Sequence, residues 1–294
     1  MLYNWPLSSN WPHDRVLVNM SEEIYPLGRD GVESKRLNDQ HKLLVDFVGG
    51  VIDSTIPLEY ISSVADVATG TGIWLRDAQK LLNEKCPDPT RYFQGFDISA
   101  AQFPPLVEGI ELSVQDIFQP FPAEHHNRYD LVHVRLLVTG IPESTYPAAV
   151  ANLLTILKPG GYLQWVEIDW ANPGTDDARV EPISETWKAF LALNNLSLSA
   201  PNALEKAATD AGLLNVVHRQ FSPRIHKELV ERAQKWQWEF FAGVFPAVML
   251  KMGKAANMAE AGEKAGELLD GVRSFFDDGE IFDTRFGVVV GQKP

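Results

Sequence analysis

A short apolar run that breaks into a glycine-rich turn is the feature of this sequence that most limits its fold. Residues 61–67 are mostly apolar and carry one acid, Asp66; the chain then passes through Gly70 and Gly72 into an amphipathic pattern over 73–84. Glycine has no Cβ and tolerates positive φ, so a ligand can approach the backbone closely. The following helix adds free N–H groups and the positive end of its dipole. The pattern predicts a strand, a loop and a helix that together bind a ligand.

Short apolar runs alternate with helical patterns along the rest of the chain. We expect strands over 62–67, 92–97, 110–114, 129–134, 161–168, 214–220 and 285–291, and helices over 31–48, 73–84, 143–157, 183–198, 202–212 and 226–276. The first and fourth strands carry apolar residues on both faces, as strands buried in parallel sheets do. Such alternation predicts an α/β fold with a doubly wound, mostly parallel sheet.

The composition limits the class of partner. The chain has 294 residues and a formal net charge of −13, with 26 Lys and Arg against 39 Asp and Glu. This balance disfavours nucleic acid or an anionic membrane as the main partner. The one cysteine, Cys86, cannot form an internal disulfide, and we expect a reducing, cytoplasmic location. We expect no signal peptide, and no apolar run reaches the roughly 18 residues needed to span a bilayer.

The residues after the glycine turn narrow the choice of ligand. A dinucleotide site has a third glycine where this chain has Leu75. A triphosphate-binding loop ends in Gly-Lys-Ser/Thr, which is absent here. No paired Asp or His ligands occur at a workable spacing, so we expect no metal. The loop therefore predicts a ligand without a pyrophosphate.

Acidic residues at the ends of the next two strands indicate a nucleoside. Asp97 ends the second strand, and the carboxyl ends of neighbouring strands meet at the switch point of such a sheet. A carboxylate there can accept hydrogen bonds from both ribose hydroxyls. Asp116 follows the third strand and can reach the exocyclic amine of an adenine, with Ile98 and Ile117 as apolar walls. These residues predict an adenosine-shaped pocket.

Six motifs occur along the chain. They are an upstream segment from Tyr25 to His41, Asp66-x-Ala-x-Gly-x-Gly72, Phe96-Asp-Ile-Ser99, Gln115-Asp116, Tyr129-Asp-Leu-Val-His-Val-Arg135 and Leu157-Lys-Pro-Gly-Gly-Tyr162. This ordered set resembles class I S-adenosylmethionine-dependent methyltransferases of the fungal secondary-metabolism type. The resemblance implies a Rossmann-like, seven-stranded sheet with a helical cap and an N-terminal helical arm. It implies that Gly70 and Gly72, with Ala68, lie near the methionine and ribose of the cofactor, that Asp66 orients the loop or meets the cofactor's amino group, and that S-adenosylhomocysteine is the product.

The expected organisation has three parts. We expect residues 1–58 to form an arm and lid, and residues 59–170 to form the cofactor-binding core. Residues 171–294 are expected to complete the sheet and to supply a substrate cap from 183–200 and 226–276. Aromatic residues are frequent in that last part, and an apolar cap favours a small, fairly apolar acceptor.

Candidate catalytic and substrate-binding residues follow the fourth and fifth strands. His133 is a candidate base and Glu167 a candidate for acceptor binding or lid positioning, because both are expected at the carboxyl edge of the sheet. Arg135 is expected to bind an acidic acceptor or to pair with a carboxylate. Tyr25 and Trp165 are further candidates for substrate contact.

The expected reaction is transfer of a methyl group to oxygen or nitrogen of a small secondary metabolite. Two alternatives stay open. One is a cyclase or pericyclase that keeps the cofactor without transferring its methyl; the other is a regulatory, protein-interacting relative. A nicotinamide oxidoreductase ranks last. The sequence leaves open a homodimer.

Overall fold

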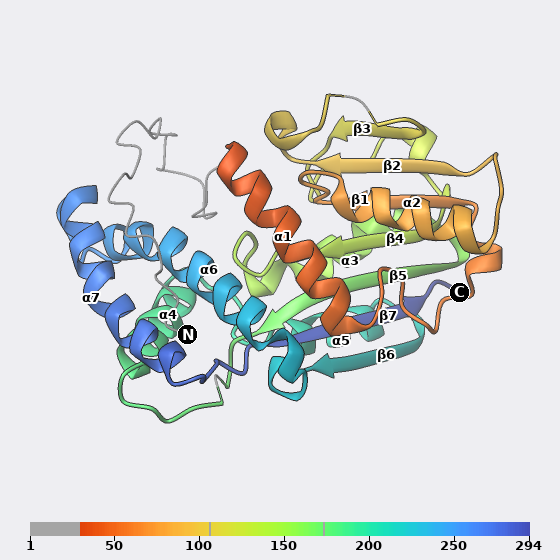
Figure 1. Ribbon diagram of the computed structural model, residues 1–294. Coiled ribbons are helices and arrows are strands. Elements are labelled where there is room, and N and C mark those ends of the chain that lie inside the picture. The colour runs from red at the N-terminus through yellow and green to blue at the C-terminus, as the bar shows by residue number, and fades with distance from the viewer. Residues whose placement is uncertain (1–29, 106, 173) are drawn as a thin grey trace.

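Seven strands form one sheet in the computed structural model, which describes residues 30–294 except 106 and 173. Their order is β3-β2-β1-β4-β5-β7-β6, and β7 is the antiparallel strand between β5 and β6 (Figure 1). This arrangement confirms the predicted doubly wound, mostly parallel sheet. The strands are β1 Ser63–Val67, β2 Tyr92–Asp97, β3 Ile110–Val114, β4 Tyr129–Arg135, β5 Leu157–Asp169, β6 Leu214–Phe221 and β7 Arg285–Gln292.

Helices join and cover these strands. The α-helices are α1 Gly31–Val48, α2 Ile73–Lys85, α3 Tyr146–Ile156, α4 Glu181–Leu193, α5 Ala200–Asp210, α6 Val230–Lys251 and α7 Met258–Asp277. Short 3-10 helices in the described residues are Leu58–Tyr60, Ala100–Gln102, Ala123–His125, Glu143–Thr145, Pro223–Ile225 and Lys227–Leu229. None of the helices within the described part of the chain is long and apolar enough to cross a membrane.

Several predicted boundaries differ from the structure by a few residues, among them the helix expected over 183–198, which is Glu181–Leu193, and two regions differ in the kind of element. The helical pattern over 226–276 is two helices, because Gly253 has a φ of +67° and Asn257 starts a new helix by accepting a hydrogen bond from the Glu260 N–H at 3.1 Å. Strand β5 begins at Leu157 rather than at residue 161. Both differences arise at glycine-containing turns, whose continuation depends on neighbouring chain segments.

Alternate residues of the central strands pack against two different layers. Val64 on β1 and Leu131 on β4 belong to the apolar cluster beneath α2, together with Trp74 and Leu75. The intervening strand residues face the larger cluster on the other side, where α3 and α5 pack. The predicted burial of β1 and β4 on both faces is therefore confirmed.

Three helices form a cap at the end of the sheet toward which the parallel strands point. Figure 1 shows α4, α6 and α7 grouped at that end, with α1 crossing between them and the sheet. Helix α6 packs along α7 and also contacts α1. Aromatic rings fill the interior of the cap: Trp187 lies 5.3 Å from Phe240 between ring centroids, and Phe241 lies 5.5 Å from Phe245. The cap therefore covers the sheet edge at which the predicted site residues gather.

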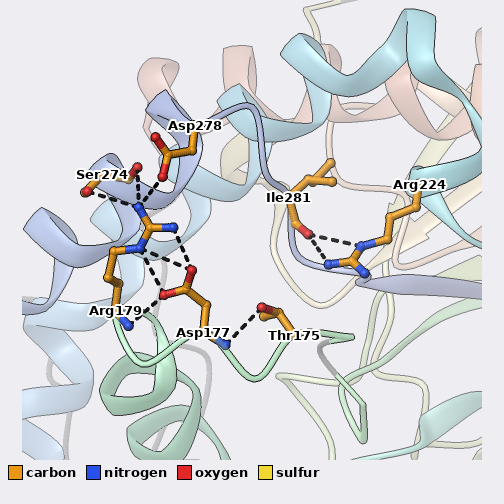
Figure 2. Close-up of polar contacts among 7 residues, drawn as sticks. All are labelled: Thr175, Asp177, Arg179, Arg224, Ser274, Asp278 and Ile281. Carbon is orange, nitrogen blue, oxygen red and sulfur yellow. Dashed lines mark hydrogen bonds and ion pairs between the residues drawn. The ribbon is translucent and has the colours of Figure 1, made fainter.

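Two arginine side chains fasten loops near the cap (Figure 2): Arg179 joins the segment between β5 and α4 to α7, and Arg224 joins the segment after β6 to the connection into β7. Arg179 donates to Asp177 within its own loop and to Asp278 at the end of α7, the latter at 2.6 Å. It also donates to the Ser274 carbonyl at 3.0 Å. Arg224 donates to the Ile281 carbonyl, before β7. The bonds of Arg179 to Ser274 and Asp278 hold its loop against the end of α7.

Substitution at Gly271 tests this fastening. A Cβ at Gly271 would lie 2.2 Å from the Arg179 carbonyl oxygen, so Gly271→Ala forces the loop away from α7. We expect the free energy of unfolding to fall by about 1–3 kcal/mol, as overpacking does. Urea denaturation of the intact chain measures it.

Gly266 provides the matched control on the same helix. Nothing lies within 4 Å of a Cβ there, so Gly266→Ala is expected to stabilise the helix by up to about 1 kcal/mol. Equal unfolding midpoints for the two variants would contradict the close approach at Gly271.

Candidate functional site

The turn after β1 holds its backbone in the left-handed region at three positions. Ala68, Gly70 and Gly72 have φ values of 60°, 54° and 68°. The Thr69 N–H donates to the Phe96 carbonyl of β2 at 2.9 Å, which ties the turn to the neighbouring strand. Gly72 is the N-cap of α2, and no side chain caps that helix. The turn and the start of α2 are therefore held by backbone hydrogen bonds.

Asp97 connects this turn to the end of β2. Its Oδ2 accepts a hydrogen bond from the Gly70 N–H at 2.8 Å, and its Oδ1 accepts one from the Ser99 N–H at 3.1 Å. One strand further on, Asp116 Oδ1 accepts from the Phe118 N–H at 2.9 Å. Both carboxylates are therefore oriented by the backbone at the carboxyl edge of the sheet.

A cavity of about 390 Å³ lies along this edge, within the range of roughly 300–1,000 Å³ typical of small-molecule sites. Its two ends differ in chemistry. One end is formed by the turn and the carboxylates at the ends of β1 to β3; the other is mostly apolar and includes Leu137, Val138, Ile168 and the rings of Trp170 and Phe240. These two rings stack with centroids 5.3 Å apart.

Most of the predicted cofactor residues line this cavity. They are Asp66, Ala68, Gly70, Asp97, Ile98, Asp116 and Ile117. Gly72 is not among the lining residues; it lies behind the turn as the cap of α2. Arg135 also lines the cavity. Tyr25 lies outside the described residues.

His133 does not reach the cavity, which corrects the expectation that it acts as a base. Its side chain is fully buried, its ring stacks on Trp74 at 3.6 Å, and its Nδ1 lies 2.8 Å from Asp66 Oδ1. Burial lowers the pKa of His133, so the ring is neutral and donates from Nδ1 to the carboxylate. Strand β4 continues to Arg135, and His133 therefore lies two residues inside the strand, beneath α2. The geometry assigns it a role in holding Asp66.

Glu167 and Trp165 are also behind the cavity rather than in it. Both are fully buried, and Glu167 Oε1 accepts from the Trp165 Nε1–H at 2.9 Å. The same carboxylate accepts from the backbone N–H groups of Leu137 and Val138, at 2.8 Å and 3.2 Å. Strand β5 continues beyond Glu167 to Asp169, and neither Trp165 nor Glu167 lines the cavity. Instead, Glu167 supports the loop after β4, residues 136–141, which forms the apolar wall of the cavity.

Several lining residues were not singled out from the sequence. Helix α1 contributes Arg36, Leu37 and Gln40, and the cap contributes Phe240. Trp170 directly follows β5 and lines the apolar end. The sequence feature that could have identified Trp170 is its position directly after Asp169, the last residue of β5.

Metal ligands do not gather at this site. Across residues 30–294 apart from 106 and 173, no group of three or more His, Cys, Asp or Glu side chains is arranged to hold a metal ion.

A family model described as a methyltransferase domain matches residues 52–266, which include β1 to β6. The methyltransferase grgD of Penicillium sp is 37% identical over 212 residues, covering 68% of this chain and 73% of the relative. The N-methyltransferase sirN of Leptosphaeria maculans is 35% identical over 151 residues, 51% of each chain. The N-methyltransferase verN of Clonostachys rogersoniana is 28% identical over 215 residues, covering 72% of this chain and 69% of the relative.

The buried carboxylate of Glu167 predicts a pH-dependent stability. Burial raises the pKa of Glu167 to about 7, and the N–H bonds from Trp165, Leu137 and Val138 only partly offset this. Because the pKa of Glu167 is raised in the folded state, its contribution to the free energy of unfolding is fully present below about pH 4.5 and is lost as the pH rises through 7. From pH 5 to 8, we expect the wild type to lose about 2 kcal/mol of unfolding free energy relative to Glu167→Gln. Urea denaturation at the two pH values measures this difference.

Glu267→Gln is the control for this measurement, because Glu267 is exposed on α7. We expect its free energy of unfolding to change with pH as that of the wild type does. A Glu167→Gln variant with that same slope would contradict the raised pKa of Glu167.

Proposed function

The chain belongs to the methyltransferase-domain family, and from this premise we propose that it transfers a methyl group from S-adenosylmethionine to oxygen or nitrogen of a small, fairly apolar metabolite. The observation that carries the proposal is the position of Asp97. Its carboxylate lies at the end of β2 and accepts the Gly70 N–H of the turn that follows β1. An acid held in this way can accept hydrogen bonds from the two hydroxyls of a ribose.

The residues at one end of the cavity fit an adenosyl sulfonium. Asp116 and the apolar side chains of Ile98 and Ile117 suit an adenine, which offers an amine at its edge and two flat faces. The left-handed turn leaves the backbone close to the ligand. The lining acids Asp66, Asp97 and Asp116 suit a ligand that carries positive charge.

The other end of the cavity supports an apolar acceptor. Leu137, Val138 and Ile168 line it together with the stacked rings of Trp170 and Phe240. Side chains of this kind bind a flat or apolar molecule by excluding water from both surfaces. Two of the relatives described above are N-methyltransferases by name, which supports nitrogen as one of the two acceptor atoms.

The chain's own contribution to the reaction is positioning. The cofactor supplies a methyl group that is already activated on a sulfonium. The apolar wall and the cap are proposed to hold the acceptor in line with that methyl at about 3–3.5 Å. Glu167 keeps residues 137 and 138 in place through their N–H groups, and the cap excludes water from the acceptor.

The remaining assignments stay proposals. We propose that residues 59–170 act as the cofactor-binding core and 171–294 as the rest of the sheet with the substrate cap. Of the arm and lid expected over 1–58, residues 1–29 lie outside the described residues, and residues 30–58 are proposed to act as the lid. A small molecule is the proposed partner, with no metal, nucleic acid or membrane. A cytoplasmic location and a homodimer stay predictions from the sequence.

Cofactor binding is tested by Asp97→Ala. Loss of hydrogen bonds to a charged carboxylate costs about 1.5–3 kcal/mol, so we expect the affinity for S-adenosylhomocysteine to fall about 10- to 100-fold. Isothermal titration calorimetry measures it. The control is Asp270→Ala on the exposed face of α7, which should bind as the wild type does. A wild-type chain that binds neither S-adenosylmethionine nor its product would sink the proposal.

Methyl transfer is tested with S-adenosylmethionine labelled in the methyl group. We expect the label to appear in an apolar acceptor together with an equal amount of S-adenosylhomocysteine, both measured by mass spectrometry. Conversion of a substrate with the cofactor left unchanged would instead support the cyclase alternative and contradict methyl transfer.

A further inference from the structure

A cation in the cavity wall has a neutral side chain as its hydrogen-bond partner. Arg135 ends β4, is only partly exposed and lines the cavity. Its Nη1 donates to His41 Nδ1 of α1 at 2.8 Å. Among the described residues, no carboxylate lies within ion-pair distance of Arg135, and none of its nitrogen atoms is both sealed from solvent and unpartnered. The remaining N–H groups therefore reach an accessible surface.

His41 is held in the form that cannot neutralise this charge. Its Nδ1 accepts from Arg135, so its proton is on Nε2, which donates to Asp77 Oδ2 of α2 at 2.8 Å. The side chain is fully buried. Burial, followed by the charge of Arg135, lowers the pKa of His41 to about 4, so the ring is neutral at pH 7. Burial lowers the pKa of Arg135 to about 10, which leaves it protonated.

The other charged groups near Arg135 have partners of their own. Asp66 accepts hydrogen bonds from His133 and Thr69. The second lining cation, Arg36, donates twice to Glu33, at 2.8 Å and 2.6 Å. The cavity wall thus contains one guanidinium whose charge no directly bonded carboxylate balances, among the residues described. A planar guanidinium matches a carboxylate in two parallel hydrogen bonds.

Such a carboxylate could belong to an acidic acceptor or to the amino-acid tail of the cofactor, and the position of Arg135 distinguishes between the two. Val134 pairs with Val67, so Arg135 ends its strand beside Ala68 and the glycine turn. The apolar wall begins only after it, at residues 136–141. The ends of β2 and β4 lie two strand spacings apart, roughly 10 Å, on either side of β1. A ribose at Asp97 would thus direct the amino-acid tail of the cofactor across β1 toward Arg135.

We propose that Arg135 binds the α-carboxylate of the cofactor, and that His41 and Asp77 are positioning residues that hold its guanidinium toward the cavity. This inference rests on the proposed function. The arrangement joins α1, α2 and β4, so the helix that covers the cavity is fastened through the same arginine that contacts the ligand.

The test compares S-adenosylmethionine with decarboxylated S-adenosylmethionine, which lacks only the carboxylate. Calorimetry with the full chain should show that the wild type binds the decarboxylated ligand about 10- to 100-fold more weakly, the effect of losing charged hydrogen bonds. Arg135→Gln should weaken S-adenosylmethionine by a similar factor and change the affinity for the decarboxylated ligand less than about twofold. Arg273→Gln on the exposed face of α7 is the control and should change neither.

The role of His41 has its own pair of variants. His41→Leu removes the acceptor for Arg135 and should selectively weaken binding of the carboxylate-bearing ligand. His41→Gln restores an amide oxygen and an amide N–H and should recover part of that affinity, which a general loss of packing would not do.

The measurements distinguish a failure of the Arg135 assignment from a failure of the proposed function. Equal weakening of both ligands by Arg135→Gln, or equal wild-type affinities for them, overturns the assignment of Arg135 while the proposed function stands. A wild-type chain that binds neither ligand overturns the proposed function and this inference with it.

Discussion

The rest of the site depends on the hydrogen bonds that the buried carboxylate of Asp66 accepts. It accepts a hydrogen bond from the Thr69 hydroxyl at 2.6 Å and one from His133 Nδ1 at 2.8 Å. The first bond folds the turn back on β1, and the second ties it to β4, where Trp74 covers the imidazole. A buried charge is tolerated only when it is fully hydrogen-bonded, so the turn, the two strands and α2 adopt one relative arrangement.

The same principle extends outward in two directions. Toward β2, Asp97 accepts a hydrogen bond from the Gly70 N–H. Toward β5, Glu167 accepts hydrogen bonds from N–H groups of the loop after β4. A half-buried carboxylate at Asp97 and a fully buried one at Glu167 thus orient the backbone on both sides of the cavity. Asp97 and Asp116 also line the cavity, and further side chains line it at Arg135, Trp170 and Phe240. Polar groups near the sheet hold the site in shape, and the lining side chains provide its chemical selectivity.

The predicted sheet and the cavity-lining acids depended on local signals and could be read from the sequence. Glycine at positions with positive φ, and an acid directly after an apolar strand, have the same meaning in many contexts. His133, Trp165 and Glu167 do not line the cavity, because β4 and β5 extend to Arg135 and Asp169; of the two roles expected for Glu167, the structure is consistent with positioning a loop. A shift of two residues keeps the same face of the strand but moves a side chain from the open edge to the interior.

The sequence by itself determined the alternation of strands and helices, the left-handed turn at Gly70 and the acid at Asp97. These features follow from backbone sterics and from the periodicity of apolar residues, which act over a few neighbours. Only the tertiary structure decided that His41 meets Arg135 across 94 positions and that α1 covers the cavity. Such contacts depend on where strands end and how helices pack, so they are a property of the whole fold rather than of any segment.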